Sequence, residues 1–141
     1  LNKMRKTISY KNLYYLTNNP HRLYADATLS SVPVNGGLIP HSDGKDKLVT
    51  MLLCMNSKKE WNPKISGHTA ICKPKKEYNS FNRVNFSLKY SEVINIKKIE
   101  HKTNNMVMFL KTFNSLHSIP IIKKTNNHPF RNSLLINIRK K

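Results

Sequence analysis

Acidic residues are scarce in this sequence of 141 residues. It contains 7 Asp and Glu against 25 Lys and Arg, which gives a formal net charge of +18. A compact chain with so large an excess of one sign repels itself unless a polyanion neutralises it. The composition therefore predicts a partner that carries many negative charges.

Cysteine, glycine and long apolar runs are also rare. Cys54 and Cys72 each lack a second cysteine nearby, so a Cys-x-x-Cys zinc or redox motif is excluded and two buried thiols are expected. The chain has 4 glycines, and the segment from Gly37 to Lys45 does not have the spacing of a phosphate-binding loop. No apolar run is long enough to span a bilayer, so we expect no transmembrane segment.

The chain lacks the arrangements of side chains that support catalysis. Its carboxylates show no paired spacing, and its histidines lie in no recognisable nucleophile motif. His68 precedes Cys72 by four residues, but two ligands do not make a metal site. We therefore expect no enzyme activity, no cofactor, no metal and no small-molecule substrate.

The basic residues are spread along the whole chain, and no acid follows Glu100. Lysine outnumbers arginine by 20 to 5, which favours point-charge contacts with phosphates over paired hydrogen bonds to base edges. A solvated lysine surface is the alternative reading. The residues that we expect to bind RNA are Lys3, Arg5, Lys6, Arg22, Lys73, Lys75, Lys76, Lys97, Lys98, Lys123, Lys124, Phe130, Arg131, Arg139, Lys140 and Lys141.

Two regions are expected along the chain. Residues 1–47 form a basic N-terminal extension, in which 7–17 has the pattern of a short amphipathic helix and 28–47, with its glycines and prolines, that of an irregular loop. Residues 48–141 form an RNA-binding domain with a basic C-terminal tail. Within this domain, the segment 113–124 is expected to be helical despite Pro120.

Apolar runs and alternating patterns predict the strands of this domain. The predicted strands are 48–55, 64–73, 83–99, 106–110 and 134–138. The fold class that follows is α+β, with a small, mainly antiparallel sheet, one or two short helices, and extended basic tails and loops.

From residue 65 onward the sequence resembles the C-terminal half of the large-subunit ribosomal protein six family. The resemblance rests on the segments ISGHTA at 65–70, LKYSE at 88–92, NNMVMFL at 104–110 and HPFRN at 128–132. Lys89 and Glu92 stand where the family has Gly and His, and the glycines of its last turn are absent. The resemblance implies that Pro129, Phe130 and Arg131 contact ribosomal RNA.

Charge, size and this resemblance together predict a structural, RNA-binding component of a ribosome. Its 18 asparagines and many Ile and Lys codons indicate an A+T-rich gene, and the start at Leu1 favours an organellar one. We expect the mitochondrial matrix as its location, with ribosomal RNA and neighbouring ribosomal proteins as partners. The alternative is an accessory structural subunit of an organellar membrane complex whose lysines contact anionic lipid.

Overall fold

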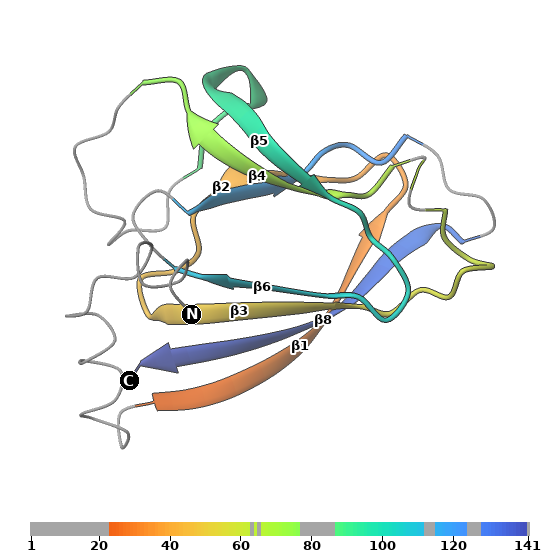
Figure 1. Ribbon diagram of the computed structural model, residues 1–141, viewed down its shortest axis with the longest axis horizontal. Coiled ribbons are helices and arrows are strands. Elements are labelled where there is room, and N and C mark those ends of the chain that lie inside the picture. Colours follow the sequence, from red (N-terminus) through yellow and green to blue (C-terminus); the bar gives the residue numbers. More distant parts are fainter. Residues whose placement is uncertain are drawn as a thin grey trace, which may run out of the picture.

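The protein is a β-sandwich in the computed structural model, which describes residues 23–62, 64, 66–76, 87–111, 115–123 and 128–140. Two four-stranded sheets face each other, and all strand pairs are antiparallel (Figure 1). Sheet A has the order β1-β8-β3-β6 and sheet B the order β2-β7-β4-β5. The strands of sheet A are β1 (Leu23–Pro33), β8 (Phe130–Lys140), β3 (Lys47–Cys54) and β6 (Met106–Leu110), and those of sheet B are β2 (Leu38–His41), β7 (Leu116–Ile119), β4 (Thr69–Pro74) and β5 (Val93–Ile99).

The expected α+β class is wrong. The described residues contain no α-helix, and the single helical element among them is the 3₁₀ turn η2 (Tyr90–Glu92). Part of the segment 113–124, where a helix was expected, forms β7 instead. Pro120 directly follows this strand, and a proline is unfavourable inside a helix. The described residues include no helix with the length and apolar composition that a membrane crossing requires.

The loop expected over 28–47 is wrong as well. Residues 23–33 form β1, which pairs along its whole length with β8, and residues 38–41 form β2 at the edge of sheet B. The expected boundary after residue 47 falls inside β3, whose first residue is Lys47. The helix expected over 7–17 lies outside the described residues.

The other expected strands are present, and all but one have different limits. The strand expected over 64–73 corresponds to β4, Thr69–Pro74. The run at 48–55 became β3, and 106–110 became β6 with the same limits. The last strand, β8, is longer than the expected 134–138. The expected strand 83–99 is confirmed over Val93–Ile99, whereas Tyr90 lies in η2 and 83–86 lie outside the described part of the chain.

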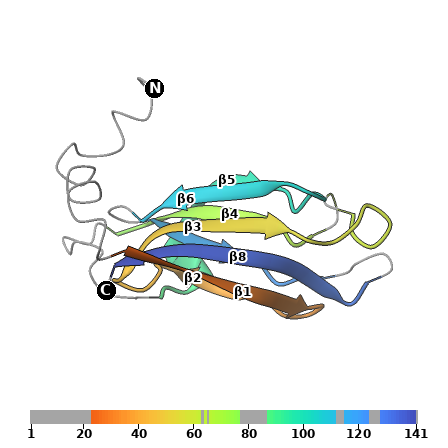
Figure 2. The ribbon, with the colours of Figure 1, turned by 90° about the horizontal axis from the view of Figure 1, so that it is seen from below.

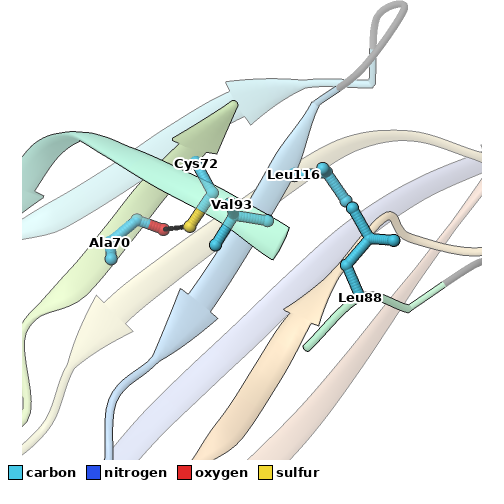
Figure 3. Close-up of a cluster of buried hydrophobic side chains, with 5 residues drawn as sticks. All are labelled: Ala70, Cys72, Leu88, Val93 and Leu116. Carbon is cyan, nitrogen blue, oxygen red and sulfur yellow. Dashed lines mark hydrogen bonds between the residues drawn. The ribbon is translucent and has the colours of Figure 1, made fainter. Parts of the chain in front are cut away.

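One apolar cluster lies on the face of sheet B that points away from sheet A. It consists of Ala70, Cys72, Leu88, Val93 and Leu116 (Figure 3). The Cys72 thiol donates to the carbonyl oxygen of Ala70 over 3.7 Å. Burial raises the pKa of the Cys54 and Cys72 thiols, so both stay protonated at neutral pH. The prediction of two buried thiols is confirmed.

A second cluster fills the space between the sheets at one end. It contains Val32, Trp61, Ile119 and Ile122. Gly67 packs against this tryptophan with a backbone φ of 78°, and a Cβ atom there would lie 2.3 Å from Cζ2 of Trp61. The position therefore requires glycine for both its backbone conformation and its space.

Candidate nucleic-acid interface

The edge strands β5 and β6 lie on the same side of the sandwich (Figures 1 and 2). Residues of both strands and of their connection line an open groove. Its volume is about 590 Å³, and Lys97, Lys98 and Lys102 line it together with Met106 and Met108. The groove is therefore lined by cations and by flexible apolar side chains.

The charge of the groove is mainly uncompensated. Lys97 and Lys98 are exposed, and neither is in an ion pair within the part of the chain that the structure describes. Lys102 pairs with Glu100 over 2.8 Å at the surface, which lowers the pKa of Glu100 and keeps it ionised. Because exposed pairs of this kind are weak, Lys102 can exchange the carboxylate for a phosphate at little cost.

Five of the predicted RNA-binding lysines belong to one antiparallel strand pair, β4–β5, or directly follow it. Lys97 and Lys98 are consecutive residues of β5, so their side chains point to opposite faces of sheet B. Lys73 faces Ile94 across this pair, and Lys97 and Lys98 face Ile71 and Ala70. Lys75 and Lys76 follow directly after β4, and all five lysines are exposed. We call this group, Lys73, Lys75, Lys76, Lys97 and Lys98, the basic β4–β5 surface.

The remaining predicted residues are dispersed. Lys123 and Lys140 are exposed, and Phe130 is exposed at the start of β8. Arg139 pairs with Asp26 and Asp46, which compensates its charge. The pKa of Asp46 is lowered mainly by this arginine, and that of Asp26 by the hydrogen bond from Asn137 and then by Arg139. Six predicted residues lie outside the described part of the chain: Lys3, Arg5, Lys6, Arg22, Lys124 and Lys141.

Arg131 lies inside the fold and not at the surface. Its guanidinium is 1% exposed and donates to the Gly67 carbonyl oxygen (2.7 Å), to Ser133 Oγ (2.9 Å) and to Thr69 Oγ1 (3.1 Å). Thr69 begins β4 of sheet B, whereas Arg131 and Ser133 belong to β8 of sheet A. The side chain therefore joins the two sheets, and we leave it out of the interface.

A second surface is the outer face of sheet A. Figure 2 looks onto this face, from below in the view of Figure 1. Three rows of apolar residues cross all four strands in the order β1, β8, β3, β6. The rows are Leu29-Leu134-Leu53-Met106, Ala27-Ile136-Met51-Met108 and Ala25-Ile138-Val49-Leu110. Leu29 is 77% exposed, and Met106 and Met108 are both more than half exposed.

The inner face of the same sheet is unusually polar. Thr50 and Asn137 are buried there and hydrogen-bonded to each other (3.2 Å), and Ser133 and Arg131 are buried on the same face beyond Leu135. Leu52 and Cys54 are the buried apolar residues of β3 on this face. Because neighbouring residues of a strand point to opposite faces, the apolar side chains of β3 and β8 are mostly directed outward. Sheet A therefore directs most of the apolar side chains of β3 and β8 to its outer face.

The structure also brings together two histidines and a carboxylate that the sequence does not connect. His41 of β2 is the register partner of His117 of β7, with their ring centroids 4.4 Å apart, and Asp43 lies two residues after β2. In the described residues these three form the group with the geometry to hold a metal ion. Their separation along the chain explains why spacing alone could not indicate them.

Comparison of the sequence with known families and proteins found no match. No protein-family model matches the chain, and no curated protein matches it by sequence.

Proposed function

We propose that this chain is a structural component of a ribosome, the mitochondrial one, and that it binds ribosomal RNA through phosphate contacts. The observation that carries the proposal is the basic β4–β5 surface, continued by the groove between β5 and β6. Binding, and not turnover, is the activity that this surface favours.

Lysines in this arrangement fit a nucleic-acid backbone. Each is a point charge on a flexible stem, able to follow phosphates without reading base edges. Ile94 and Ile96 of β5 are more than half exposed beside them. These apolar side chains can cover sugars or unstacked bases once the phosphates are held.

The outer face of sheet A supports a role within a particle. Its three apolar rows contain no charged side chain, so this face does not complement RNA. A contiguous apolar face on a soluble chain marks a site of protein contact. We assign this face to a neighbouring ribosomal protein, and the basic β4–β5 surface to the RNA.

Sedimentation of native extract tests the assignment to a particle. We expect the chain to co-sediment with a ribosomal subunit, and to leave that fraction after ribonuclease treatment or in high salt. Persistence in a membrane fraction after ribonuclease would contradict the proposal and favour the accessory subunit of a membrane complex.

Salt-dependent RNA binding tests the surface itself. In the Lys97→Gln/Lys98→Gln variant we expect the slope of log K against log salt to fall by about 1.5, because two phosphate contacts are lost. The matched control is Lys45→Gln/Lys58→Gln, which removes two exposed lysines outside the β4–β5 pair. Equal losses in the two variants would show that net charge, and not this surface, determines the affinity.

A further inference from the structure

We propose that His41, Asp43 and His117 bind a divalent transition-metal ion, with zinc as the best match to these ligands. The three residues each offer a ligand atom, and these atoms all lie within 4.8 Å of one another. Two imidazoles and one carboxylate are a common set of three protein ligands for zinc, with a fourth position left for water or another group. Magnesium and calcium prefer sites made of oxygen atoms alone.

The two imidazoles are held in the tautomer that leaves Nε2 free to bind a metal. Nδ1 of His41 lies 2.8 Å from the carbonyl oxygen of Ile39, and Nδ1 of His117 lies 3.3 Å from that of Ser115. A carbonyl oxygen can only accept, so each Nδ1 carries the proton and each Nε2 has a free lone pair. Zinc-bound histidines in proteins are usually oriented by a hydrogen bond of this kind.

The surroundings of His117 keep it neutral and screen it from water. Its ring lies 4.5 Å from that of Phe109, which belongs to the opposite sheet. Burial, together with the neighbouring His41, lowers the pKa of His117 to about 4.

Asp43 has capacity for a metal ligand and one competitor. Oδ1 accepts from Lys47 Nζ (3.0 Å) and Oδ2 from Thr50 Oγ1 (2.8 Å), which leaves one lone pair on each oxygen. Lys111 donates to the backbone oxygens of Asp43 and Gly44 and not to the carboxylate. Lys47 is thus the cation that a metal has to displace or tolerate at this carboxylate.

A bound ion would connect both sheets. His41 and His117 belong to sheet B, whereas Asp43 lies on the segment that leads from β2 into β3 of sheet A. The ion would therefore fix the short edge strand β2 and the crossing from one sheet to the other. Because the ion binds the folded chain in preference to the unfolded one, it should raise the thermal midpoint of unfolding.

Zinc and cobalt titrations of the full chain test the site. After removal of metal with a chelator, we expect calorimetry with Zn²⁺ to give one equivalent per chain, and Co²⁺ to give the absorption of a tetrahedral complex. In His117→Gln the affinity should fall at least tenfold. The matched control is His128→Gln, which removes a histidine outside the group.

Lys47→Met provides a test that a loss of folding cannot imitate. Removing the competing ammonium group should strengthen zinc binding several-fold, whereas a damaged fold would weaken it. Absence of stoichiometric Zn²⁺ binding by the unmodified chain would overturn the proposal. So would an equal loss of affinity in His117→Gln and His128→Gln, or an unchanged affinity in Lys47→Met.

Discussion

Arg131 is a buried cation whose partners in the described residues are neutral oxygens. Its hydrogen bonds to Gly67, Thr69 and Ser133 replace the water that the guanidinium loses on burial. Burial lowers its pKa to about 10, so it keeps its charge at neutral pH. A charge held in this way depends on all of its partners, which makes the residue a sensitive point of the fold.

Replacement of Arg131 by methionine should therefore destabilise the chain. The change keeps an apolar stem but leaves the Gly67 carbonyl oxygen and two hydroxyl groups without their donor. We expect a loss of about 3 kcal/mol in the free energy of unfolding, measured by urea denaturation. Lys140→Met, at an exposed position of the same strand, should change it by less than about 0.5 kcal/mol. Equal effects would show that Arg131 is not used inside the fold.

His101 gives stability a dependence on pH. It is 2% exposed, its Nε2 lies 3.0 Å from Asn56 Oδ1, and burial, followed by the charge of Arg131, lowers its pKa to about 3. In the unfolded chain His101 binds a proton near pH 6.5, whereas in the folded chain it stays neutral down to about pH 3. The free energy of unfolding therefore decreases as the pH falls from about 6.5 toward 3.

The expected loss from His101 is about 1.4 kcal/mol for each pH unit in that range. His101→Gln keeps a donor for Asn56 and removes the titration. Urea denaturation at pH 7, 6 and 5 should therefore show a shallower decline for the variant than for the unmodified chain. Parallel declines would assign the pH dependence to other groups.

Among the elements, the strands that the sequence predicts are those with continuous apolar runs. β3 and β6 have such runs, and they were found with nearly correct limits. β1 was missed because its outward positions include two alanines and its inward positions include Asp26 and Ser30. β7 was missed because four residues with a histidine and a serine do not show a period.

The outer face of sheet A allows a prediction about one strand. Leu29→Lys on β1 places a charge in an apolar row without touching the interior, so the free energy of unfolding should change by less than about 0.5 kcal/mol. We expect the apolar rows to make the purified chain self-associate, and light scattering should show clearly less association in the variant. The matched control is Ile121→Lys, at a residue that is 57% exposed outside the three rows. A similar fall in the control would mean that added charge alone is responsible.

At the scale of the whole molecule, the basic excess was evident from composition, whereas its placement was not. The lysines of β4 and β5 were predicted from the sequence to bind RNA. Only the pairing of the two strands brings Lys73 and Lys97 onto one surface. The histidine–aspartate group depends on the pairing of β2 with β7, two strands that the sequence did not predict. Arg131 was predicted to bind RNA at the surface, because nothing in the sequence of a basic segment distinguishes a buried arginine from an exposed one.

The net charge of +18 should make the isolated chain sensitive to ionic strength. Salt screens the mutual repulsion of the lysines, so we expect thermal unfolding to shift upward as sodium chloride is raised from dilute buffer to about 0.3 M. A gain of 1 kcal/mol corresponds to a shift of about 4 °C in the thermal midpoint. A lower midpoint in salt would show that the ion pairs of Asp26, Asp43 and Asp46 outweigh the repulsion.

Strand β8 pairs with β1 on one side and β3 on the other, yet it follows both in the sequence by a long distance. Sheet A consequently cannot assemble before residues 130–140 have left the exit tunnel, because β1 and β3 both pair with this strand. Until then β1 and β3 have unpaired edges and apolar side chains open to other chains. Production of this protein should accordingly depend on chaperones, or on RNA and a partner close enough to receive it as soon as β8 has been made.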